Sequence, residues 1–119
     1  MAQAGPLRAV LLNAVSAAGP SLAVDCSSYT NITIYLTDNG TTSGGNIIVE
    51  EADWDPGPNS QQQNYVGTWS AITTIAASTL TPSSQTAYHL PAPSCYANVR
   101  VRSSGITGGG TISAVLRAT

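Results

Sequence analysis

Short runs in which apolar and polar residues alternate recur along this 119-residue chain, and they constrain its fold more than any other feature. In residues 29–36, YTNITIYL, the side chains of Ile32, Ile34 and Leu36 fall on one side of an extended chain and polar side chains on the other. A period of two is typical of a β-strand with one dry face and one wet face. Helical periodicity is nearly missing after residue 20. The sequence therefore predicts an all-β protein.

The C-terminal segment, residues 96–119, contains two such runs on either side of a glycine turn. Apolar residues alternate with Arg100 and Arg102 in the first run, and the second run ends at Arg117. The glycines at 108–110 can adopt the positive φ angles that a tight reversal needs. The pattern predicts a β-hairpin with all three arginines on its wet face. They are either solubilising edge charges or contacts to a negatively charged partner.

Further strands and turns follow along the rest of the chain. The prediction is for strands in residues 46–52, 66–75 and 85–90, and for a short extended piece in residues 22–25. Residues 7–15, LRAVLLNAV, are expected to form either a strand or a short helix that ends before Gly19-Pro20. Seven or eight short strands separated by turns predict an antiparallel β-sandwich or jelly roll.

A chain of this length forms a single domain with its own core. We expect residues 1–21 to be an N-terminal arm or first strand, and residues 22–119 to be the β-sandwich domain. Residues 53–65, DWDPGPNSQQQNY, are polar and without periodicity, which predicts a long loop. Asn13 and Ser16 interrupt the apolar stretch near the N-terminus, so a cleaved signal peptide is not expected.

Charged residues make up only 8% of the sequence, lysine is absent, and the formal net charge is -2. A general nucleic-acid binder would carry a basic surface, so no nucleic-acid partner is expected. No apolar run approaches the ~20 residues that span a bilayer, so no membrane partner is expected either. A wet surface of small hydroxylated residues favours an extracellular or particle-bound protein over a cytosolic enzyme.

The candidate catalytic groups are few. Four of the six acids cluster in the segment EEADWD, where alternation places Glu51 and Asp53 on one face and Glu50 on the other. Such carboxylates could act as a glycosidase pair or bind calcium, but a solvated strand end is the simpler interpretation. His89 is accompanied by no nucleophile elbow and is expected at the surface or an interface. We therefore expect no enzyme, no catalytic residue, no metal and no cofactor.

Two cysteines and two tryptophans leave alternatives open. Cys26 and Cys95 each precede a predicted strand and could bridge one edge of the sandwich, although two buried thiols are slightly favoured without a secretion signal. Trp69 has alternating neighbours and is expected in the core. Trp54, in the polar loop, either folds back onto the sandwich or joins Tyr65 in contacting a sugar or a protein.

Four segments in order resemble small virion proteins of tailed bacteriophages. They are AVDCSSYTNITIYL (23–36), GNIIVEEADWD (45–55), GTWSAI (67–72) and YANVRVRSSGITGGGTISAVLRA (96–118). The order of the segments, rather than any single motif, carries the resemblance over most of residues 23–119. The chain departs from the pattern in the proline-rich insertion at residues 53–64 and in the N-terminal extension at residues 1–21.

The resemblance implies a non-enzymatic β-sandwich, most like a head decoration (cement) protein that binds across capsomers and stabilises the head. The expected partners are the major capsid protein and further copies of the chain in a homotrimer. The expected location is the outer surface of the phage head, after assembly in the host cytoplasm. The alternative is a carbohydrate-binding module of a phage tail or fibre, which would bind a surface glycan. The residues expected at an interface are Leu7, Arg8, Val10, Leu11, Leu12, Trp54, Tyr65, Arg100 and Arg102.

Overall fold

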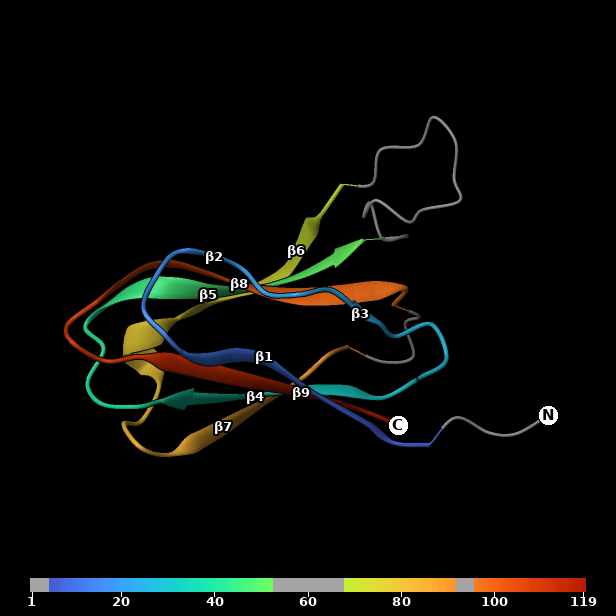
Figure 1. Cartoon of the computed structure of the whole chain (residues 1–119), viewed down its shortest axis with the longest axis horizontal. Coiled ribbons are helices and arrows are strands. Elements are labelled where there is room, and N and C mark those ends of the chain that lie inside the picture. Colours follow the sequence, from blue (N-terminus) through green and yellow to red (C-terminus); the bar gives the residue numbers. More distant parts are fainter. Residues whose placement is uncertain (1–4, 53–67, 92–95) are drawn as a thin grey trace.

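Two antiparallel β-sheets face each other in the computed structural model of the chain, which describes residues 5–52, 68–91 and 96–119 (Figure 1). Sheet A contains, in spatial order, β1 (Leu7–Val15), β9 (Ile112–Ala118), β4 (Ile32–Asp38) and β7 (Gln85–His89). Sheet B contains β2 (Gly19–Pro20), β8 (Asn98–Thr107), β5 (Gly44–Ala52) and β6 (Ser70–Ala76), and β3 (Val24–Asp25) also pairs with β8. A 3₁₀ turn, η1 (Ala77–Thr79), follows β6. The predicted all-β class and antiparallel sheets are confirmed.

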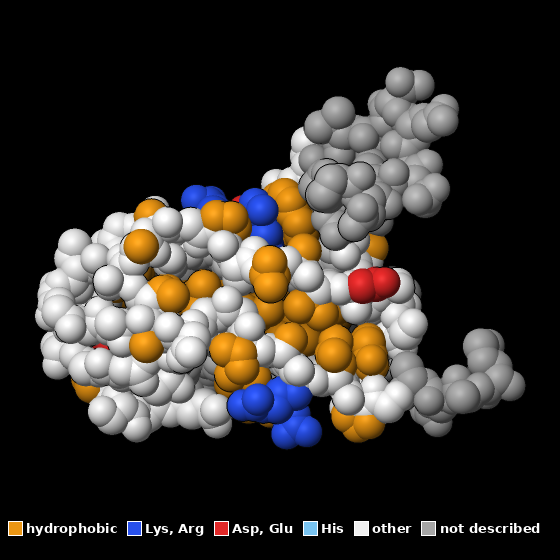
Figure 2. All heavy atoms as spheres, in the orientation of Figure 1, with side chains coloured by type: hydrophobic (Ala, Val, Ile, Leu, Met, Phe, Trp, Pro, Cys, Tyr) orange, Lys and Arg blue, Asp and Glu red, His pale blue; other side chains and the backbone are white. Residues whose placement is uncertain are grey.

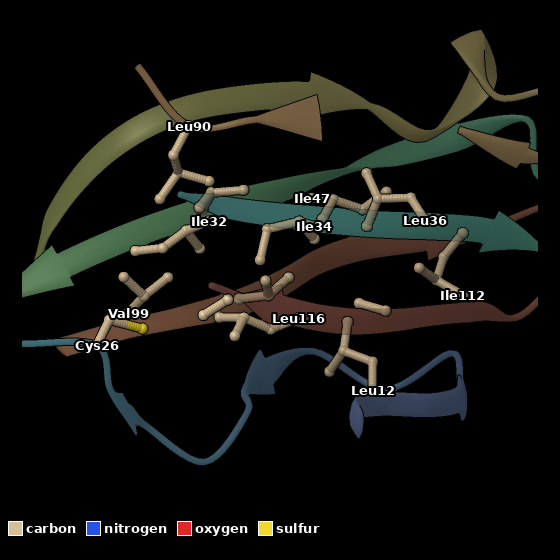
Figure 3. Packing of buried hydrophobic residues seen from close by; sticks show 14 of the residues in the cluster. Leu12, Cys26, Ile32, Ile34, Leu36, Ile47, Leu90, Val99, Ile112 and Leu116 are labelled. Carbon is tan, nitrogen blue, oxygen red and sulfur yellow. The ribbon is translucent and has the colours of Figure 1, made fainter. Parts of the chain in front are cut away.

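The inward face of each sheet supplies the core. The alternation expected in residues 29–36 is confirmed, since Ile34 and Leu36 are fully buried and Ile34 lies opposite the buried Leu116 of β9. From sheet B, Ile47 and Val49 of β5 pair with buried positions of β8 and close the core from the other side (Figure 3). Each large apolar side chain removed from water in this way contributes roughly 1.5–3 kcal/mol.

The last two strands do not form the expected hairpin. β8 belongs to sheet B and β9 to sheet A, so the glycine segment between them carries the chain from one sheet to the other. Gly108 and Gly109 adopt positive φ angles of 99° and 88°, as the turn requires, whereas Gly110 does not. The hairpin prediction was wrong because a period of two shows which side of a strand is dry but not which sheet the strand joins.

The N-terminal residues 7–15 form a strand rather than a helix. β1 is the edge strand of sheet A and pairs with β9 from Leu7 opposite Ala118 to Val15 opposite Ile112. Its register shifts twice, and Ala14, at the second shift, has a φ of 52° and donates its N–H to Ser113 Oγ at 3.0 Å. Such bulges twist an edge strand and discourage pairing with another chain.

A buried carboxylate organises the end of the sandwich where β4 leads to β5. Asp38 is 1% exposed, and its two oxygens accept hydrogen bonds from the Thr42 backbone N–H at 2.9 Å and from Thr42 Oγ1 at 2.8 Å. Gly110 packs against this pair, because a Cβ there would overlap Thr42 Oγ1 and lie 2.6 Å from Asp38 Oδ1. The carboxylate thus fixes the loop after β4, and Gly110, in the crossing after β8, packs closely against it.

The strands lie close to their predicted positions, with β4 beginning at Ile32 and β6 at Ser70. The predicted loop at residues 53–65 lies outside the described residues, as do residues 1–4 at the N-terminus. Among the residues that the structure describes, no helix has the length and apolar character needed to cross a membrane.

Candidate functional site

The expected interface residues of β1 divide between the core and the surface. Leu12 is 5% exposed and belongs to the core, and Leu7 and Leu11 are partly buried against it. Arg8 and Val10 point away from the core, and Val10 is 52% exposed. Only these two residues of β1, within the expected set, therefore present their side chains to a partner. Trp54 and Tyr65 lie outside the described residues.

The outer face of sheet B holds a buried acid between two arginines. Glu50 of β5 lies directly opposite Arg100 of β8 and accepts a hydrogen bond from Arg100 Nε at 2.9 Å. Arg102 Nε reaches the second carboxylate oxygen at 3.4 Å. The side chain of Glu50 is 8% exposed, against 20% for Arg100 and 39% for Arg102. We call these three residues the Glu50 cluster, and it neutralises one of its two positive charges internally.

Trp69 completes this surface, although it was expected in the core. The guanidinium carbon of Arg100 lies 4.2 Å from the centroid of the Trp69 ring, a distance at which a cation–π contact is favourable. The register of β6 explains the position. A bulge leaves Thr73 opposite the buried Val49 but Ala71 opposite the outward Glu50, so Trp69, two residues before Ala71, also faces outward.

The neighbouring acids do not extend the Glu50 cluster. Glu50 and Glu51 face opposite ways, as alternation predicted, because Glu50 pairs with Arg100 and Glu51 with the buried Val99. Asp53 and Asp55, the other acids of the predicted group, lie outside the described residues. Within residues 5–52, 68–91 and 96–119, no group of three or more His, Cys, Asp and Glu side chains is placed to hold a metal ion.

The outer face of sheet A carries a row of basic and polar side chains across all four strands. The register places Arg8 opposite Arg117, Arg117 opposite Thr33, and Thr33 opposite His89. Thr33 Oγ1 and His89 Nδ1 are 2.9 Å apart and hydrogen-bonded, and His89 is exposed as expected. We call these four residues the basic row. Arg117 was expected beside Arg100 and Arg102, but it belongs to sheet A and they belong to sheet B. Figure 2 shows basic side chains on two opposite sides of the molecule.

An apolar row runs beside the basic row. It consists of Val10, Val115, Tyr35 and Ala87, one residue from each strand of sheet A. Val10 and Ala87 are exposed at the two ends, and Val115 and Tyr35 are half-buried between them. Sequence inspection missed both rows, because their members are separated by up to 109 positions in the sequence and meet only through the pairing of β1, β9, β4 and β7.

Cys26 lies in the core as a buried free thiol, and Cys95 is outside the described residues. Burial, and to a lesser degree the neighbouring Asp25 carboxylate, raise the pKa of the Cys26 thiol to about 11. Asp25 itself has a lowered pKa because the hydroxyl and the backbone N–H of Ser27 donate hydrogen bonds to it, at 2.7 Å and 2.9 Å. Thiolate is the reactive form of cysteine, so this environment makes Cys26 a poor nucleophile.

We expect Cys26 to resist iodoacetamide at pH 8 in the folded protein, because only about a thousandth of a thiol with this pKa is ionised at that pH. After unfolding in guanidinium without reductant, it should be alkylated rapidly. Peptide mass spectrometry of both samples measures the labelling of Cys26 and Cys95 separately. A Cys26 that stays unlabelled in the unfolded protein until reductant is added would instead establish a disulfide.

Comparison with known proteins finds a similar fold but no family. No family model matches the sequence, and no curated protein matches it significantly. The crystal structure of the SPBc2 prophage-derived protein YomS is similar, with a TM-score of 0.55 and 10% sequence identity over 95% of this chain and 93% of that chain. At this identity the likeness shows a shared fold across nearly the full length of both chains.

Proposed function

We propose that this chain is a non-enzymatic structural protein of a bacteriophage particle, and that it acts as a decoration (cement) protein on the outside of the capsid. The observation that carries the proposal is the shared fold with a prophage-derived protein over 95% of this chain. The four segments quoted above, which resemble small virion proteins of tailed phages, support it independently. The proposed partner is the major capsid protein, bound where neighbouring capsomers meet.

The order of the strands supports a jelly-roll assignment. If β2 and β3 are taken as two parts of one interrupted edge strand, each sheet has four strands, and sheet A runs β1-β9-β4-β7 while sheet B runs β2/β3-β8-β5-β6. Every chain connection except that from β5 to β6 then crosses between the sheets. Two interleaved four-stranded antiparallel sheets of this kind are the jelly-roll arrangement, which viral capsid proteins use. We propose this fold type for the domain.

The two outer faces suit a protein whose function is to cover and join others. Both faces present arginines beside small polar or apolar side chains, and arginine is enriched in protein interfaces. A cement protein stabilises a capsid by adding buried interface across its joints. Three copies around a threefold joint would form the proposed homotrimer.

The carbohydrate-binding alternative depends on Trp54 and Tyr65, which lie outside the described residues. Trp69, the other tryptophan, already has Arg100 against its ring. The described surface therefore offers more support for a protein partner than for a sugar, and the decoration role is the function that we propose.

Quantitative mass spectrometry of purified particles tests the proposal. We expect this chain at a large fixed fraction of the copy number of the major capsid protein. Particles that lack it should lose their DNA at a lower temperature than complete particles, and purified protein added back should restore the higher temperature. A few copies per particle would place the chain in the tail and favour the glycan-binding alternative. Absence from particles would refute the virion role.

A further inference from the structure

The arginines of the two outer faces differ in whether an acidic side chain pairs with them. On sheet B, Arg100 and Arg102 share the carboxylate of Glu50. On sheet A, Arg8 and Arg117 lie directly opposite each other, and neither forms an ion pair within the described part of the chain. Like charges placed opposite each other on neighbouring strands destabilise a sheet. The basic row therefore holds positive charge that the described residues do not balance.

The acidic side chains that the structure describes all lie away from the outer face of sheet A. Asp25 belongs to β3, and Glu50 and Glu51 belong to β5, all in sheet B. Asp38 is at the end of β4 in sheet A, but its side chain is buried and bonded to Thr42. A chain with a net charge of -2 thus places two of its four arginines together on a face that has no acid among its described residues.

We propose that the outer face of sheet A is the docking surface of this protein and that it binds an acidic patch on a partner protein. Aspartate and glutamate side chains of the partner would pair with Arg8 and Arg117, whose planar guanidinium groups each match one carboxylate with two parallel hydrogen bonds. The Thr33 hydroxyl and the His89 ring lie at the far end of the same row and offer further polar contacts. This inference rests on the proposed function, in which the partner is the capsid.

The apolar row gives this surface the character of a protein interface. Val10, Val115, Tyr35 and Ala87 form a strip across the sheet beside the charges, and Figure 2 shows apolar atoms next to the basic side chains over β1 and β9. Protein interfaces combine an apolar centre with polar contacts that set register and exclude other partners. A nucleic-acid site would instead need a larger excess of positive charge, because binding affinity comes largely from basic groups that neutralise the phosphates.

The test mixes the purified chain with particles that lack it and measures binding by co-sedimentation. The double variant Arg8→Gln/Arg117→Gln should bind at least tenfold more weakly than wild type, because both charge pairs are lost. Wild-type binding should also weaken as salt is raised. The variant Arg8→Lys/Arg117→Lys, which keeps the charges, should retain more of the binding than the glutamine pair. The thermal midpoint of the glutamine variant should be equal to or above that of wild type, since a repulsion is removed.

The matched control is Thr41→Asp/Ser78→Asp, which changes the net charge by the same two units at exposed positions outside sheet A's outer face. It should bind like wild type.

If wild type binds and the Arg8→Gln/Arg117→Gln variant binds equally well, the proposed docking surface is wrong and the decoration role stands. If the control loses as much binding, overall charge rather than the basic row is responsible. If nuclease treatment abolishes binding, the partner is nucleic acid. If wild type does not bind particles at all, the proposed function and this inference both fail.

Discussion

Substituting Gly110 with alanine should destabilise the sandwich by about 3 kcal/mol, the sum of a steric overlap and weakened buried hydrogen bonds. The new methyl group would meet Thr42 Oγ1 and Asp38 Oδ1, the two atoms that form the bond at the centre of the buried turn. A shift of either atom to relieve the overlap would weaken that bond, and Asp38 has no access to water as a substitute partner. Chemical denaturation, followed by circular dichroism, measures the change in the free energy of unfolding.

Gly109→Ala is the matched control for this prediction. Gly109 has a φ of 88° but open space where a Cβ would be placed, so alanine there meets backbone strain without collision. That strain costs about 1 kcal/mol. If the two alanine variants are equally stable, packing against the Asp38 carboxylate is not what requires glycine at position 110.

Glu50→Gln should destabilise the protein by about 2 kcal/mol, although glutamine has nearly the same shape. The substitution removes the negative charge that Arg100 and Arg102 share and leaves two partly desolvated guanidinium groups beside an uncharged side chain. Removing one partner of a buried ion pair is costly because the remaining charge is uncompensated, and the partial exposure of both arginines reduces the effect here. Thermal and urea unfolding measure the change.

Glu51→Gln is the control for charge, since it removes the same charge from the adjacent residue. Glu51 is half-buried and points to the other side of β5, away from Arg100. Its substitution should change the stability by less than about 0.5 kcal/mol. Equal losses in the two variants would show that the Glu50 cluster contributes nothing beyond net charge.

The sequence predicted the strands well and their partners poorly, for a physical reason. The buried positions of β4 and β9 follow from alternation alone, because burial on one side of a strand leaves a period of two in the residues. The assignment of β8 and β9 to different sheets leaves no such mark. A glycine turn that reverses the chain within one sheet and one that crosses to the other sheet have the same composition. The predicted grouping of Arg117 with Arg100 and Arg102 failed with the hairpin.

The candidate surfaces depend even more on long-range pairing. Arg100 and Arg102 were expected at an interface, but their shared partner Glu50 is half a chain away and is set only by the register of β5 against β8. Trp69 was misplaced by a single extra residue in β6, since one bulge exchanges the two faces of a strand. Arg8 and Arg117 are neighbours only because the first strand of the sandwich pairs with the last.

The pairing of β1 with β9 has a consequence for the order in which the protein is made. On the ribosome, β1 emerges early, but its neighbour in sheet A is not available until β9 has been synthesised. Folding by such distant pairings is slow compared with folding by local contacts. Arg8 and Arg117 therefore come together only after β9 has been synthesised and has paired with β1. A chain stalled before β9 would lack Arg117, so a partner that binds through both arginines would bind chains that contain β9 and not shorter fragments.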